Sequence, residues 1–161
     1  MDEKLRRQLL AQQLDLASAA ASVLDESRGR VDAVLESARP GVLLSIEQRE
    51  SCEALTSRFA RLCDLITQRL FRTLDQVELA DEGTVLDRLM RAEKRGIIES
   101  ANEWRELREL RNDIAHDYLI EFSDRVLAEA HRRAPVLLAA VQKMTDYVRA
   151  KGYADRTSSP I

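Results

Sequence analysis

The sequence predicts an all-α protein folded as an antiparallel, up-and-down bundle of about five to six helices. Apolar residues recur at steps of three and four along most of the chain, a spacing that places them on one side of a helix. Leu, Ala, Val, Arg and Glu dominate the composition, while aromatic residues make up only 4% of it, which favours helices over strands. No stretch alternates apolar and polar residues as a half-buried strand does. Helices that pack on helices are therefore the expected way to build a core.

The first half of the chain is expected to form three helical stretches. The first should end near Ser27-Arg28-Gly29, and a short second one over 31–38 should end at the corner Pro40-Gly41. A long central helix follows, since the clearest apolar periodicity of the chain covers 52–77. The apolar stripe of the first helix is Leu10, Leu14, Ala17, Ala21 and Leu24, and that of the central helix is Cys52, Leu55, Phe59, Leu62, Ile66, Leu70, Leu74 and Val77.

Side chains that cap helices mark the beginning of the next two. Thr84 can cap a helix that should stop near Gly96. Ser100 opens the following helix, with Glu103 three residues later in the position of a capping box. The apolar stripe of this second helix is Trp104, Leu107, Leu110 and Ile114.

The last helix is expected from about Ser123, and Pro135 should kink or split it because proline removes a backbone donor. A chain of 161 residues suits one domain. We therefore expect residues 1–151 to form a single helical bundle and residues 152–161 to form a flexible C-terminal tail.

The chain is expected to be soluble and cytoplasmic. It contains no apolar run near the roughly 18 residues that span a bilayer, and its first residues lack the apolar stretch of a signal peptide. Cys52 and Cys63 are 11 positions apart in a helical stretch, hence about 16 Å apart, too far for a disulfide. Both are expected to be buried thiols.

The charge balance argues against a general binder of polyanions. The net charge is -3, whereas non-specific nucleic-acid binding depends on clustered Lys and Arg. Seven cations occur over 85–111, but six acidic residues alternate with them, a pattern typical of a solvated helical surface. Any contact with RNA must therefore be local.

One dense polar cluster remains as a candidate site. The two histidines, His116 and His131, have no second ligand at a recognisable metal-binding spacing, so we expect no catalytic metal and no cofactor. Glycine-rich phosphate loops and nucleophile elbows are missing as well. The cluster consists of Arg111, Asn112, Asp113, His116, Asp117 and Tyr118.

The cluster has two interpretations from its residues alone. On a helix, Asn112 and His116 share a face, and Arg111 and Tyr118 nearly eclipse each other. Histidine can move a proton near neutral pH, and the planar fork of arginine matches phosphate oxygens, so the set could cleave RNA. The structural interpretation, which the residues alone favour, is that Arg111 pairs with Glu109 or Asp113, that His116 caps carbonyls at a helix end and that Tyr118 packs at the corner. His131 is expected at the surface, with no role.

The motif resembles a known family. Arg111, His116 and Tyr118 reproduce the spacing Arg-x4-His-x-Tyr of HepT toxins in the HEPN superfamily, and Asn112 after the arginine is also typical. Gly96-Ile97-Ile98 and Pro135 are similar to the same family, so the resemblance covers roughly 85–148. It implies a HEPN-like bundle that forms a homodimer with the motif helices facing each other.

The resemblance also implies an activity and a partner. His116 would act as general base or acid on the RNA 2′-hydroxyl, Arg111 would stabilise charge on the phosphate, and Asn112 would orient either group. Arg108, Asp113 and Asp117 would contact the RNA or tune the local field, and DNA would be spared. A nucleotidyltransferase antitoxin of the MntA kind would silence this toxin by attaching AMP to Tyr118.

A second HEPN-like function stays open. Trp104 is similar to a residue of a sister group that binds substrate for separate nucleotidyltransferases and need not cleave RNA. On that reading the chain is a catalytically silent subunit that dimerises. A purely structural helical bundle is the third possibility.

Overall fold

The computed structural model describes residues 2–117 and 124–154, and this part of the chain is helical with no strand. The fold class predicted from the sequence is therefore confirmed for the described residues. The elements are α1 (Glu3–Ser37), α2 (Ile46–Asp64), the π-helical segment η1 (Leu65–Leu70), α3 (Phe71–Val77), α4 (Val85–Lys94), α5 (Ala101–Asp117) and α6 (Asp124–Ala150).

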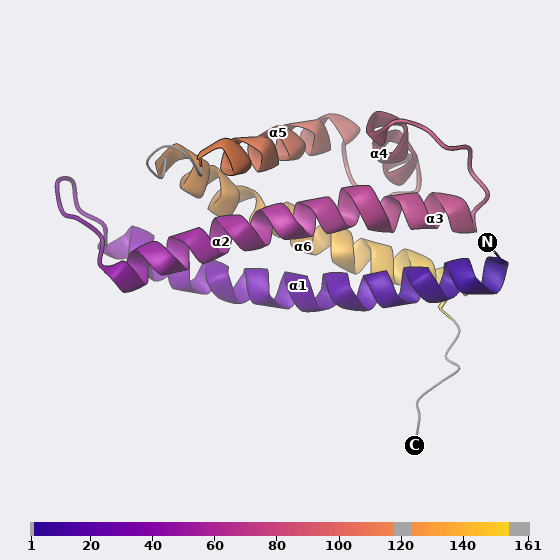
Figure 1. Ribbon diagram of the computed structural model, residues 1–161, viewed down its shortest axis with the longest axis horizontal. Helices are drawn as coiled ribbons and strands as arrows, with labels where there is room; N and C mark the ends of the chain where they lie inside the picture. Colours follow the sequence, from indigo (N-terminus) through magenta and orange to yellow (C-terminus); the bar gives the residue numbers. More distant parts are fainter. Residues whose placement is uncertain (1, 118–123, 155–161) are drawn as a thin grey trace, which may run out of the picture.

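Successive long helices run in opposite directions and pack side by side (Figure 1). The elements α2, η1 and α3 join end to end, so they form the long central helix that the apolar periodicity predicts. This central helix contacts α1, α5 and α6. The short α4 lies across the end of the bundle where α3 stops (Figure 1). Counted this way, the described residues form five separate helices, within the predicted range.

Aromatic side chains anchor α5, the helix that carries the motif, against the central helix. Trp104 is 1% exposed, and its ring lies 5.7 Å from that of Phe71, tilted by 54°. Leu107 and Leu110 extend the same buried side of α5. Arg111 follows Leu107 by four positions, so it lies beside this buried stripe and faces the central helix, whereas Asn112 and His116 lie on the exposed side of α5.

The capping residues of α4 and α5 are placed as predicted. The Thr84 hydroxyl accepts a hydrogen bond from the backbone N–H of Asp87, whose carboxylate in turn accepts from the Thr84 backbone. The Ser100 hydroxyl accepts from the backbone N–H of Glu103. α4 ends before Gly96, which has a φ of +74°, a conformation that favours glycine.

The first helix differs from the sequence-based prediction. α1 continues through Gly29 to Ser37, so the break expected near Ser27-Arg28-Gly29 was wrong. Val31 and Val34 extend the buried stripe beyond the glycine, and buried Ser27 accepts a hydrogen bond of 2.7 Å from Arg58 of α2. One glycine costs a helix only about 1 kcal/mol, and this packing offsets it.

α6 is one helix from 124 to 150 with Pro135 inside it, so of the two expected effects of the proline the split does not occur. After this helix, the Tyr153 hydroxyl donates a hydrogen bond of 3.1 Å to Glu78, and Arg7 lies over the Tyr153 ring. Tyr153 therefore packs against the bundle.

The two cysteines are free and buried, as predicted. Burial, and then the neighbouring Asp64 carboxylate, raise the pKa of the Cys63 thiol to about 12. A thiol with such a pKa stays protonated at neutral pH and is a poor nucleophile. Cys63 is therefore a core residue.

Candidate functional site

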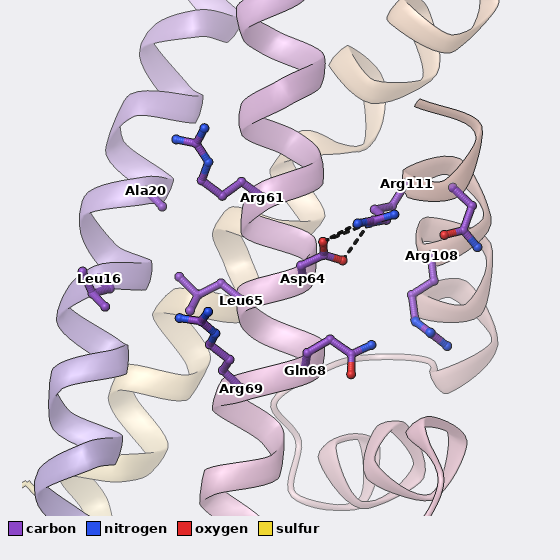
Figure 2. Close-up of a pocket in the computed structure, with 10 residues that line it drawn as sticks. Leu16, Ala20, Arg61, Asp64, Leu65, Gln68, Arg69, Arg108 and Arg111 are labelled. Carbon is purple, nitrogen blue, oxygen red and sulfur yellow. Dashed lines mark hydrogen bonds and ion pairs between the residues drawn. The ribbon is translucent and has the colours of Figure 1, made fainter. Parts of the chain in front are cut away.

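A groove of about 850 Å³ runs over the central helix between α1 and α5 (Figure 2). The end of α2 and the start of η1 form its floor, and α1 and α5 form its two walls. Four of the described residues that line it are arginines, and one is an acid. The lining residues are Leu16 and Ala20 of α1, Arg61, Asp64, Leu65, Gln68 and Arg69 of the central helix, and Arg108, Arg111 and Asn112 of α5.

Arg111, the arginine of the motif, forms an ion pair with Asp64 across the groove. Its Nε lies 2.8 Å from Oδ1 and 3.0 Å from Oδ2 of Asp64, and its Nη2 lies 2.7 Å from Oδ2. The side chains are 34% and 41% exposed, so water and ligands reach both. These hydrogen bonds raise the pKa of Arg111, which remains charged. The predicted pairing with an acid is thus correct in kind, but Asp64 replaces the expected Glu109 or Asp113 because it faces α5 from the central helix.

Three polar residues of α5 follow one another at steps of four, so they share one side of the helix. Arg108 is half-buried, and Asn112 and His116 are exposed. Arg108 and Asn112 line the groove. His116 comes one turn after Asn112, about 6 Å further along the axis of the helix. The motif therefore places Arg111 and Asn112 in the groove and His116 next to it, close to the end of α5.

The predicted tuning residues do not all face this groove. Asp113 is exposed and lies 3.4 Å from Arg125 of α6, so its carboxylate points to the neighbouring helix. Asp117 is the last residue of α5. Tyr118, the predicted site of modification, lies outside the described residues.

The sequence analysis missed the part of the site that the central helix supplies. Arg61, Asp64, Gln68 and Arg69 line the groove, and Arg61 and Arg69 are exposed, with no carboxylate partner recorded within 2–117 and 124–154. A signal for them exists, because Arg61, Asp64 and Gln68 follow one another at steps of three and four beside the buried stripe. The π-helical turns at 65–70 change the register of these side chains, and such segments occur often at functional sites.

One expectation for other charged residues was wrong. A solvated surface was expected for Arg91 and Arg95, yet both bind the buried Asp75, at 2.8 and 2.7 Å. His131 is partly exposed, at 20%, and its Nε2 pairs with Asp32 of α1. These residues hold helices together, away from the groove.

Within the described ranges, no helix is long and apolar enough to cross a membrane. The same residues contain no group of three or more His, Cys, Asp or Glu side chains placed to hold a metal ion. Comparison of the chain with protein-family models, with curated proteins and with solved structures finds no match.

Proposed function

We propose that this chain is the toxin of a HEPN-type toxin–antitoxin pair and acts as a metal-independent endoribonuclease. The observation that supports this most is the position of the motif, because Arg111 and Asn112 line a groove together with Arg108. The described lining of this groove contains four guanidinium groups and one carboxylate. Such a groove suits the phosphates of RNA, since arginine binds phosphate oxygens through its planar fork.

The proposed reaction is an internal transesterification of RNA. The 2′-oxygen attacks the adjacent phosphorus, and the bond from phosphorus to the 5′-oxygen of the next nucleotide breaks. His116 takes the 2′ proton or gives a proton to the leaving 5′-oxygen, and Arg111 stabilises the charge on the phosphate. The products are a 2′,3′-cyclic phosphate and a free 5′-hydroxyl. One P–O bond replaces another, so the reaction needs no oxidant, and the proposed mechanism uses no metal. DNA would not be cut, because it lacks the 2′-hydroxyl that acts as the nucleophile.

The proposal includes a homodimer. Arg111 and His116 are five residues apart, which on an α-helix separates their directions by about 140°. One α5 helix therefore does not present both side chains to the same side of a phosphate. A second copy, with its motif helix facing the first, would supply the complementary histidine or arginine.

Cleavage of a labelled RNA in EDTA tests the proposal. Wild-type protein, made without any nucleotidyltransferase, should cut the RNA. His116→Ala should lower the rate by about 10²–10⁴-fold, because it removes the proton-transferring group. His131→Ala is the matched control, since it removes the second histidine of the chain from a place outside the groove, and it should cut like the wild type. Equal rates for all three proteins would contradict the role of His116.

The regulatory part of the proposal concerns Tyr118. A partner nucleotidyltransferase would join the tyrosine oxygen to the α-phosphorus of ATP and release pyrophosphate. The added phosphate would repel RNA near Arg111. Co-expression with such an enzyme should increase the intact mass by one AMP and stop cleavage, whereas Tyr118→Phe should gain no mass and stay active. A Tyr118→Phe protein that still gains AMP would place the modification elsewhere.

One observation favours a second function, that of a silent HEPN subunit which presents substrate to a nucleotidyltransferase. Arg111 is held by Asp64 in a bidentate pair, as an arginine with a structural role would be. Trp104 gives this alternative no surface contact, because it is buried against Phe71. Failure of the wild-type protein to cut any RNA, with the groove still binding it, would favour the silent subunit.

A further inference from the structure

We infer that the groove holds the sugar–phosphate backbone of a single RNA strand across the central helix, with Arg61 and Arg69 as phosphate contacts outside the motif. The inference rests on the proposed function, because it names how the substrate of that site is bound. It adds residues of a second helix to a site that the sequence placed on α5 alone (Figure 2).

The charge of the groove is opposite to that of the whole chain. The chain carries a net charge of -3, whereas the described lining residues comprise four arginines and one aspartate. Their formal charge is therefore +3. A local concentration of positive charge on an acidic protein attracts an anionic ligand to that one place.

The arrangement of the arginines provides two sets of phosphate contacts. In Figure 2, Arg61 and Arg69 extend on the side of the central helix that faces α1, and Arg108 and Arg111 approach from α5. Arg61 and Arg69 are eight positions apart, roughly 12 Å along the helix axis. An anion that contacts both sets must cross the central helix, which suits an extended chain of phosphates better than a single small anion.

The remaining lining residues suit a single strand of nucleic acid. Gln68 and Asn112 offer amide groups that can both donate to and accept from sugars and base edges. Leu16 and Ala20 of α1 and Leu65 of the central helix add apolar surface to the lining. The floor is one helix wide, about 10–12 Å, which fits one strand whose bases are free to turn toward the protein.

Fluorescence anisotropy with a labelled, fully 2′-O-methylated oligouridine measures this binding without cleavage, since the methyl group blocks the nucleophile. Arg61→Gln/Arg69→Gln should weaken binding by about 10-fold or more, and the slope of log K against log salt should fall by about 1.4, or 0.7 for each lost contact. Arg30→Gln/Arg49→Gln is the matched control, because it removes the same charge at exposed positions outside the groove. The control should keep the wild-type slope.

Three outcomes would overturn the inference. The first is equal loss of affinity in the groove variant and the control, and the second is no binding of the RNA by the wild type. The third is tighter binding of a labelled polyglutamate than of the RNA, which would assign the groove to an acidic protein segment. Cleavage of unmethylated RNA separates this inference from the proposed function. If the wild type binds RNA but does not cut it, the inference about the groove stands and the proposed cleavage activity fails. If the variant Arg61→Gln/Arg69→Gln binds and cuts RNA like the wild type, the cleavage activity stands and the inference about the groove fails.

Discussion

Replacement of Asp75 by alanine is expected to lower the free energy of unfolding by about 3–5 kcal/mol, because it breaks a buried ion pair on one side. Asp75 is 5% exposed and binds Arg91 at 2.8 Å and Arg95 at 2.7 Å. Arg95 is only 10% exposed, so its charge would stay buried with Glu78, 2.8 Å away, as its remaining carboxylate partner among the described residues. One carboxylate would then balance a buried guanidinium that binds two carboxylates in the wild type, and a buried charge that loses a partner is costly.

This cluster also joins α6 and Tyr153 to the end of α3 and to α4 through Glu78. Burial raises the pKa of Glu78, but hydrogen bonds from Tyr147 and Arg95 outweigh it and hold that pKa below its ordinary value. Tyr147 donates to Glu78 at 2.6 Å, and Tyr153 donates to the same oxygen at 3.1 Å. Loss of Asp75 should therefore loosen the contacts of α6 as well.

Urea denaturation followed by circular dichroism measures the effect. Glu82→Ala is the matched control, because it removes an acid from an exposed pair with Arg72 at 4.0 Å and should cost less than about 1 kcal/mol. Asp75→Asn should fall between the two variants, since the amide can still accept one hydrogen bond. A midpoint for Asp75→Ala equal to that of Glu82→Ala would show that the buried cluster contributes little.

The parts of the fold that the sequence predicted depend on local signals. Apolar periodicity located the central helix, and Thr84 and Ser100 located the beginnings of α4 and α5, because a cap satisfies backbone groups within three residues. The continuation of α1 through Gly29 was missed because the weak local preference of one glycine is outweighed by packing against residues far along the chain.

In the candidate site, too, the features set by local sequence could be predicted and those set by packing between distant residues could not. The motif placed Arg111, Asn112 and His116 on one helix from spacing alone. Asp64 is 47 positions before Arg111, and its role depends on how the central helix and α5 pack, which no local pattern reveals. The spacing of Arg61, Asp64 and Gln68 beside the buried stripe places them on the surface of the central helix, but that they and Arg69 line a groove depends on the same packing. The π-helical turns at 65–70 gave no signal in the sequence.

Arg111→Ala is expected to lower the rate of RNA cleavage by about 10²–10³-fold, as the loss of one donor to a developing negative charge does. Its effect on stability should be below about 1 kcal/mol, because the pair with Asp64 is exposed to water at both ends. Arg133→Ala is the matched control: Arg133 also binds carboxylates, those of Glu106 and Glu129, but outside the groove. This control should cut RNA at the wild-type rate.

Arg111→Lys decides whether charge or geometry matters at this position. The pair with Asp64 uses Nε and Nη2, so a guanidinium can keep that pair while Nη1 turns to a phosphate. A lysine has one ammonium group, which must choose between Asp64 and the phosphate. We therefore expect Arg111→Lys to cut almost as poorly as Arg111→Ala, and Arg111→Lys combined with Asp64→Asn to recover part of the rate because the competing carboxylate is gone. If Arg111→Lys alone cuts like the wild type, a single positive charge is sufficient at this position, and the orientation of the Arg111 guanidinium by Asp64 is not needed for cleavage.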